Sequence, residues 1–239
     1  MTDRFPAKLN YFYDVEQGSD EWHELRRGMV TASTIGALIT PKTVKVSTAQ
    51  TGLSRLTEIA AERITDMSEE PITSKDIRRG HFYEPYARDE YAKHYKVDVQ
   101  EVGFMVRDVA GLKIGYSPDG LIGDAGLIEI KSRKPRIQVQ TILDDAVPVD
   151  NMAQLQTGLF VSGREWIDYV SYSTGMPLYT KRVLPDPKWQ KTIGDALKYA
   201  EETIAAVTAD YHKRAADMPV TEYVEHIEDW EIELGGLQL

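Results

Sequence analysis

Two carboxylates and a lysine lie close together in the sequence, at Asp119, Glu129 and Lys131. The segment 127–131, Leu-Ile-Glu-Ile-Lys, alternates in the way typical of a β-strand, whose side chains point to opposite faces in turn. Glu129 and Lys131 are therefore expected to share a face. Turn-forming residues within 117–126 predict a hairpin that brings Asp119 close to Glu129.

Such a group of side chains suits a metal ion, because carboxylate oxygens are the ligands that Mg²⁺ prefers. A bound metal lowers the pKa of a water molecule, and a nearby lysine can orient that water or offset developing charge. The alternative is an exposed hairpin with a surface Glu–Lys ion pair, which is common and contributes little stability. Ile128 and Ile130 on the opposite face favour a strand buried on at least one side, where charged side chains need partners.

The stretch from Ser117 to Lys131 resembles the metal site of PD-(D/E)xK nucleases, and specifically that of the phage lambda exonuclease-like viral recombinases. Three further segments carry the resemblance, in the order found in that family. They are the amino-terminal segment 17–33 with Gly-Ser-Asp-Glu-Trp, the Arg-Gly-His-Phe-Tyr-Glu segment 79–84, and the Met-Ala-Gln-Leu-Gln segment 152–156. Together these motifs span most of residues 15–160.

The resemblance implies a mixed α/β fold with a restriction-endonuclease-like core, in which helices flank a central mixed β-sheet. It implies a Mg²⁺-dependent 5′→3′ exonuclease that degrades linear double-stranded DNA to mononucleotides and leaves a 3′ single strand for phage-type recombination by strand annealing. Two Mg²⁺ ions per site, replaceable by Mn²⁺, are expected. So are a ring-shaped homotrimer, a single-strand annealing protein as partner, and a phage or prophage gene product acting in the cytoplasm of a bacterial host. The rival interpretations are an endonuclease or repair nuclease of the same superfamily and a non-catalytic DNA-binding module.

The same resemblance assigns roles to individual residues. The implied catalytic residues are Asp119, Glu129, Lys131, Gln154 and Glu84. The implied metal ligands are Asp119, Glu129, the backbone carbonyl of Ile130, and Glu84 directly or through water. A pocket for the 5′-phosphate is implied at Arg26, Ser33 and Ser117. DNA contacts are implied at Trp22, Lys75, Ile77, Arg133, Lys134 and Arg136.

Several of these residues also have ordinary structural interpretations. Arg26 stands where a cation complements a helix carboxyl terminus, and Ser33 stands where a first-turn cap would. Ile77 has the character of a core residue on a helix. Trp22 and Leu25 have the spacing of a buried helical stripe. The basic run after Lys131 would otherwise be a solvated loop.

The elements that must position these residues follow from periodicity and turn signals. Helices are expected at 19–27, 31–39, 53–64, 74–95, 151–160 and 186–214. Strands are expected at 97–106, 112–116, 127–131, 166–172 and 177–184, with a loop at 41–48. The five histidines lack metal-ligand spacing, which excludes a zinc site of the usual type, and no Walker, Rossmann or Gly-x-Ser-x-Gly motif occurs.

The length of 239 residues suits one domain, expected over 1–214, with an acidic tail at 215–239. The net charge of −10 is unusual for a protein that binds phosphates, but seven acidic residues and no lysine or arginine lie in that tail. The rest of the chain is nearly balanced, so a local basic surface remains compatible with the composition. The absence of cysteine excludes disulfides and thiol chemistry, and no apolar run indicates a membrane span or a signal peptide.

Overall fold

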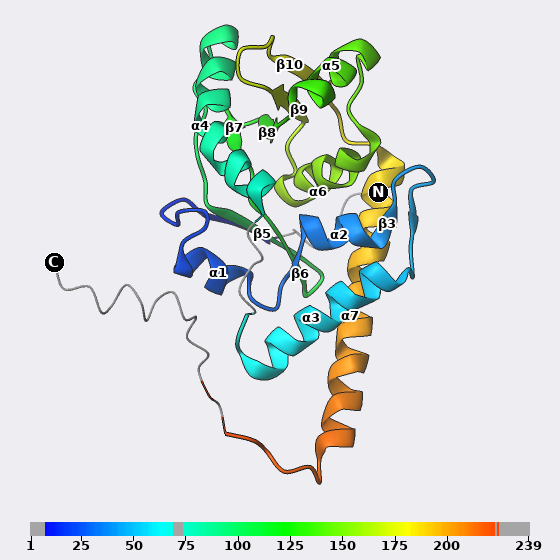
Figure 1. Cartoon of the computed structure of the whole chain (residues 1–239). Coiled ribbons are helices and arrows are strands. Elements are labelled where there is room, and N and C mark those ends of the chain that lie inside the picture. Colours follow the sequence, from blue (N-terminus) through cyan, green and yellow to red (C-terminus); the bar gives the residue numbers. More distant parts are fainter. Residues whose placement is uncertain (1–7, 69–73, 223, 225–239) are drawn as a thin grey trace, which may run out of the picture. The chain divides into compact units, whose positions relative to one another are not determined.

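The computed structural model describes residues 8–68, 74–222 and 224 (Figure 1). The chain divides into two compact units, Met1–Thr208 and Ala209–Leu239, and the first holds all of the described strands. Most of the predicted acidic tail lies outside the described residues, so the domain boundary expected at 214 stays a prediction.

The first unit is a mixed α/β structure, which confirms the predicted fold class. Its helices are α1 (Asp20–Arg26), α2 (Ala32–Leu38), α3 (Gln50–Thr65), α4 (Lys75–Tyr95), α5 (Pro135–Asp144), the short 3-10 helix η1 (Val149–Asn151), α6 (Met152–Ser162) and α7 (Pro187–Ala215), the last of which continues into the second unit. Its strands are β1 (Lys8–Phe12), β2 (Val30–Thr31), β3 (Ile39–Thr40), β4 (Lys45–Val46), β5 (Phe104–Val109), β6 (Leu112–Tyr116), β7 (Gly120–Ile122), β8 (Gly126–Ser132), β9 (Trp166–Tyr172) and β10 (Tyr179–Val183). None of the described helices is both long and apolar enough to cross a membrane.

The strands form two four-stranded mixed sheets and a small two-stranded one. The first sheet has the order β1-β5-β6-β2, with β2 parallel to β6 and the other pairs antiparallel. The second has the order β10-β9-β8-β7, in which β8 runs parallel to β9 and antiparallel to β7. The predicted hairpin is therefore β7–β8, and β8 is an inner strand of its sheet.

Burial on both faces of β8 is what distinguishes this strand from a surface hairpin. Leu127 belongs to the main hydrophobic core, whereas Ile128 and Ile130 belong to a second cluster with Ala87 and Tyr91 of α4. Helix α6 packs against strands of both sheets and also against α2, while α4 covers β8 and β9. The predicted alternation along 127–131 is confirmed, and the interpretation as an exposed hairpin is wrong.

Several local predictions differ from the structure. The predicted loop 41–48 contains part of the small β3–β4 hairpin, and the strand expected from Val97 begins only at Phe104. Before Phe104 a single bridge, Gln100 with Leu121, joins this segment to β7. Helix α5 was not anticipated, because the basic run before it is typical of a solvated loop. Pro135 occupies the first turn of α5, a position that proline favours, and was the signal available in the sequence. Helix α1 has no fully buried residue, so Trp22 and Leu25 do not form the buried stripe that their spacing predicted.

Candidate active site

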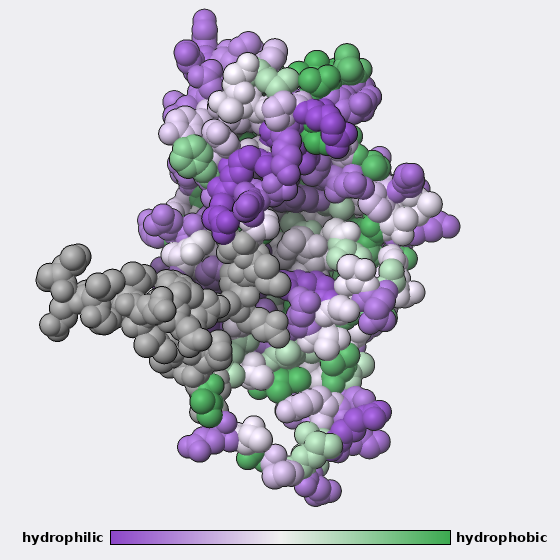
Figure 2. All heavy atoms as spheres, viewed as in Figure 1, coloured by the Kyte–Doolittle hydropathy of each residue, from purple (hydrophilic) through white to green (hydrophobic). Residues whose placement is uncertain are grey.

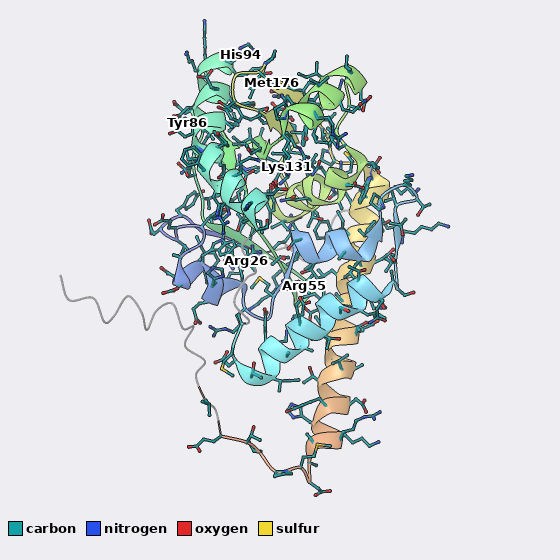
Figure 3. All side chains as sticks on the ribbon, viewed as in Figure 1. Arg26, Arg55, Tyr86, His94, Lys131 and Met176 are labelled. Atoms are coloured by element: carbon teal, nitrogen blue, oxygen red, sulfur yellow. The ribbon has the colours of Figure 1, made fainter. Side chains whose placement is uncertain are left out.

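A cavity of about 980 Å³ lies between α1, α2, the amino-terminal half of α4, β6, β8 and α6. It brings together most of the residues to which the sequence assigned a role. Those lining it are Trp22, Arg26, Ser33, Ile77, Glu84, Ser117, Asp119, Glu129, Ile130, Lys131, Arg133 and Gln154. Figure 3 marks Arg26 and Lys131, which approach this cavity from α1 and β8.

The hairpin places the two carboxylates of the motif next to each other. Asp119 Oδ2 accepts a hydrogen bond of 2.5 Å from the backbone N–H of Ile130. Glu129 Oε1 accepts one of 2.6 Å from Lys131 Nζ, and Glu129 is only 1% exposed. Because Asp119 immediately precedes β7 and Ile130 lies in β8, the pairing of the two strands sets this geometry.

Tyr116 is a residue of the site that sequence reasoning missed. Its hydroxyl donates a hydrogen bond of 2.7 Å to Glu129 Oε2, so both carboxylate oxygens of Glu129 have a donor. Burial raises the pKa of Tyr116 well above its ordinary value, and the neighbouring Glu129 adds to this, so the hydroxyl keeps its proton. The available signal was its position at the end of a strand, directly before the Ser-Pro-Asp-Gly turn.

The carboxylates of the cavity raise one another's pKa. Burial raises the pKa of Asp119 well above its ordinary value, and the charges of Glu129 and Glu84 raise it further. Burial also raises the pKa of Glu84, against the opposing effect of Arg88. Burial lowers the pKa of Lys131, but the neighbouring carboxylates outweigh it and the net shift is upward, so Lys131 is a cation. Because Glu84 pairs with Arg88, Asp119 and Glu129 have one lysine between them, and a bound cation would relieve the negative charge that remains.

The donor atoms fit a hard divalent metal. The pairing of β7 with β8 ends at Gly120 and Ile128, so the next outward-facing backbone groups on that edge of β8 belong to Ile130. The N–H and C=O of one strand residue point to the same side, and the N–H of Ile130 points to Asp119. The Ile130 carbonyl therefore faces the carboxylate group. Asp119, Glu129 and this carbonyl form an oxygen-only set of the kind that Mg²⁺ prefers.

Glu84 is the exception to this arrangement. Its Oε1 is 2.6 Å from Arg88 Nη2, in an ion pair on α4. Within the residues that the structure describes, no three His, Asp or Glu side chains are grouped so as to hold a metal. Glu84 thus lines the same cavity as Asp119 and Glu129, but the three carboxylates do not surround one point.

Arg26 forms the cationic wall of the same cavity. Its guanidinium lies 4.1 Å from the ring centroid of Trp22 and 5.4 Å from that of Phe104, and it donates a hydrogen bond of 3.3 Å to Ser117 Oγ. Among the ion pairs of the described residues, none includes Arg26. Burial, helped by the nearby charge of Arg55, lowers the pKa of Arg26 to about 10.

Taking a guanidinium partly out of water without an ion-pair partner destabilises the fold, and a bound anion would offset that cost. Two hydroxyl groups are available to the same anion. Ser117 already accepts hydrogen bonds from Arg26 and from Trp22 Nε1, at 2.9 Å in the second case. Ser33 is exposed in the cavity, with its Oγ 2.9 Å from Thr31 Oγ1. The structure therefore brings the three predicted phosphate-binding residues to one cavity.

Some of the remaining predicted residues line the cavity, and the others lie outside its lining. Gln154, in the first turn of α6, is half-buried and lines the cavity, whereas Gln156 is buried and bonds to the backbone of Leu184 and Asp186, as a structural neighbour. Ile77 is 45% exposed and lines the cavity, so its interpretation as a core residue is wrong. Arg133 also lines the cavity, where it donates to Asn151 and Tyr169.

Three predicted DNA contacts lie outside the cavity lining, at Lys75, Lys134 and Arg136, all of which are exposed. Lys134 pairs with Asp76 at 3.2 Å, at the amino-terminal end of α4. Figure 2 shows hydrophilic residues gathered over this end of the helix. They stand at the rim of the site and not within it.

The sequence of residues 21–165 matches the model of the YqaJ-like viral recombinase domain. The chain belongs to this family. The expected relationship to viral recombinases is thereby confirmed, and it covers more than half of the chain, including both walls of the cavity. No match was found among curated protein sequences.

Solved structures of this recombinase-like fold agree with the assignment. An alkaline exonuclease from Laribacter hongkongensis is 29% identical, with a TM-score of 0.73 over 84% of this chain and 100% of that one. Its complex with dAMP matches at 30% identity, with the same TM-score and coverage. A phage-related exonuclease from Haemophilus somnus 129PT, at 13% identity and a TM-score of 0.57 over 77% of this chain and 96% of that one, shares the fold. The family and the first two matches support a nuclease, and more narrowly an exonuclease.

Proposed function

We propose that this recombinase-family protein is a Mg²⁺-dependent 5′→3′ exonuclease on linear double-stranded DNA. It releases mononucleotides and leaves a 3′ single strand for phage-type recombination by strand annealing. The observation that carries the proposal is the shared cavity, which is lined by Arg26, in no ion pair of the described residues, and by the half-buried Asp119 and the buried Glu129. An anion site and a cation site in one cavity suit the terminal phosphate of a strand and the phosphodiester next to it.

The chemistry of such a site is hydrolysis by a water molecule. Asp119, Glu129 and the Ile130 carbonyl would hold Mg²⁺, or Mn²⁺ in its place, with two ions per site as in the resembling nucleases. When bound, the metal would lower the pKa of the attacking water and would neutralise charge that develops on the phosphate in the transition state. Lys131, which is hydrogen-bonded to Glu129, would donate a hydrogen bond to that water or to a phosphate oxygen. Gln154 would orient the water.

Direction and step size follow from the anion pocket. The guanidinium of Arg26 can donate paired charge-assisted hydrogen bonds to a phosphate, and Ser33 and Ser117 supply hydroxyl groups. A terminal phosphate carries more charge than an internal diester, so this pocket favours a phosphorylated 5′ end. Seating the terminal phosphate fixes which phosphodiester lies over the carboxylates, and hydrolysis there removes one nucleotide.

The cavity walls suggest how the duplex approaches. Ile77, exposed in the cavity near the start of α4, would separate the terminal base pair, and Trp22, stacked against Arg26, would support the phosphate pocket. Arg133 would contact the backbone close to the reacting phosphate. Lys75, Lys134 and Arg136 would contact phosphates further along the duplex, with no sequence preference.

The assembly and setting are further parts of the proposal. Family likeness supports a ring-shaped homotrimer and a single-strand annealing protein as partner, in the cytoplasm of a bacterial host that carries the phage or prophage.

The proposal is tested by incubating the protein with Mg²⁺ and either linear duplex or covalently closed circular plasmid. Loss of the linear DNA alone supports the exonuclease. Cutting of the circle would instead favour an endonuclease or repair nuclease, and binding without cutting would favour a non-catalytic DNA-binding module.

A further inference from the structure

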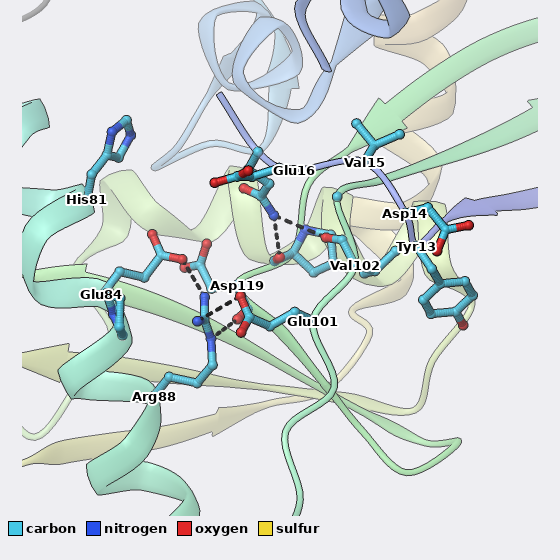
Figure 4. A pocket seen from close by; sticks show the side chains of 14 residues that line it. Tyr13, Asp14, Val15, Glu16, His81, Glu84, Arg88, Glu101, Val102 and Asp119 are labelled. Carbon is cyan, nitrogen blue, oxygen red and sulfur yellow. Dashed lines mark hydrogen bonds and ion pairs between the residues drawn. The ribbon is translucent and has the colours of Figure 1, made fainter. Parts of the chain in front are cut away.

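A second cavity, of about 440 Å³, reaches the carboxylates from another direction (Figure 4). It shares Gln17, His81, Glu84 and Asp119 with the larger cavity, so these residues stand between the two. Arg88 lines only the smaller cavity. It can therefore act on Glu84 and Asp119 without occupying the space proposed for DNA.

The guanidinium of Arg88 contacts three acceptors at once, as Figure 4 shows. One nitrogen, Nη2, lies 2.6 Å from Glu84 Oε1, and Nη1 lies 2.9 Å from Glu101 Oε2. The third, Nε, donates a hydrogen bond of 2.9 Å to the backbone carbonyl of Asp119. The Arg88 side chain is 13% exposed, so its partners rather than solvent balance its charge.

The two carboxylates on Arg88 are not equivalent. The Glu101 side chain is 71% exposed and faces only the smaller cavity, whereas that of Glu84 is 25% exposed and borders both. If Glu84 turned away, Arg88 would keep Glu101 and the Asp119 carbonyl. Removing one partner from a buried ion pair is costly because it leaves an uncompensated charge, and Glu101 removes most of that cost here.

We propose that Arg88 is a positioning residue that keeps the Glu84 carboxylate away from the metal site until a cation binds there. Glu84 exchanges Arg88 for the metal site once the cation is present, while Arg88 remains fixed on Glu101 and on the backbone of Asp119. This inference rests on the proposed metal-dependent function. It accounts for the finding that three neighbouring carboxylates are not grouped around one point in the described residues.

The exchange is tested by calorimetric titration of the full chain with Mn²⁺. Glu101→Gln should weaken Mn²⁺ binding roughly three- to tenfold, the scale of one partly buried ion pair, because Arg88 would then retain Glu84. Glu90→Gln is the matched control. Glu90 is an exposed acid on α4, the helix that carries Arg88, and its ion-pair partner is Lys93. That control should bind Mn²⁺ like the wild type.

A double-mutant cycle separates the exchange from a general loss of negative charge. In a Glu84→Gln background, Glu101→Gln should have no further effect on Mn²⁺ binding, because there is no carboxylate left to release. An undiminished effect in that background, or no effect in the wild-type background, overturns the inference. A wild-type protein that binds no Mn²⁺ overturns the metal-dependent function itself, which is a distinct result.

A further variant tests Arg88 directly, by two readouts that move in opposite directions. Arg88→Met should bind Mn²⁺ more tightly, since Glu84 is freed and a competing cation is lost. It should also degrade DNA more slowly, since the Asp119 backbone loses its donor. Weaker Mn²⁺ binding in this variant, with the fold retained, contradicts the proposed role.

Discussion

The carboxylate of Asp119 accepts a 2.5 Å hydrogen bond from the backbone N–H of Ile130. Ile130 stands between Glu129 and Lys131, so this bond ties the turn before β7 to the strand that carries the other two residues. One contact therefore fixes the spacing of the two carboxylates, and it does so through backbone geometry that a change of side chain at position 130 would leave intact.

Glu129→Gln should abolish cleavage and leave DNA binding within about twofold of the wild type. The amide has nearly the same shape but no charge for a metal, and a metal-dependent hydrolysis loses its rate enhancement without it. Because one donor, Tyr116 or Lys131, would then face an amide NH₂, a stability loss of about 1–3 kcal/mol is also expected. Single-turnover cleavage and equilibrium DNA binding are the measurements. Wild-type rates at saturating Mg²⁺ would remove Glu129 from the site.

The raised pKa of Asp119 predicts how stability depends on pH. Burial, with Glu129 and Glu84, raises this pKa well above its ordinary value of 3.8. Above 3.8 the folded protein binds more protons than the unfolded chain, so the stability of the metal-free protein falls as pH rises towards the folded pKa.

Asp119→Asn removes this penalty. In EDTA, this variant should unfold at a higher temperature than the wild type at about pH 8, with a smaller difference at about pH 5. The gain should be a few degrees, because 1 kcal/mol corresponds to roughly 2–4 °C in Tm for a protein of this size. Added Mg²⁺ should stabilise the wild type and not the variant. A less stable variant at the higher pH would show that the carboxylate is not under electrostatic strain.

Arg26→Ala should remove most of the preference for a phosphorylated 5′ end. The wild type should digest 5′-phosphorylated linear duplex faster than 5′-hydroxyl duplex, and the variant should lose roughly tenfold to hundredfold on the phosphorylated substrate alone. That range reflects about 1.5–3 kcal/mol for a hydrogen bond to a charged group. Arg27→Ala is the control, because Arg27 pairs with Glu24 and Asp66 and does not line the cavity. Equal wild-type rates on both ends would contradict the pocket.

Much of this site could be predicted from local sequence, because local geometry makes it. Alternation along β8 and the turn before β7 are enough to bring Asp119 to Glu129. The helices expected from residues 19 and 74 begin there because Ser19 and Ser74 each accept a hydrogen bond from the backbone N–H three residues later. Such signals act over a few residues and do not depend on the rest of the fold.

The unpredicted parts depend on contacts between distant segments. Tyr116, at the end of β6, reaches Glu129 of β8 across two different sheets, and Arg88 reaches the Asp119 backbone only after α4 packs against β8. Ile77 has the composition of a core residue, yet α4 turns it to the cavity. Helix spacing alone does not say which face of a helix meets the sheet.

In the proposed function, one cavity recognises a 5′ end and hydrolyses the next phosphodiester. The most direct measurement uses a linear duplex with a 5′-phosphate on one strand only and a different fluorophore at each 3′ end. With Mg²⁺, the phosphorylated strand should be lost from its 5′ side as mononucleotides, its 3′ label should be released last, and the partner strand should persist as a single strand. Early loss of the 3′ label, release of longer fragments, or equal degradation in EDTA would contradict the account.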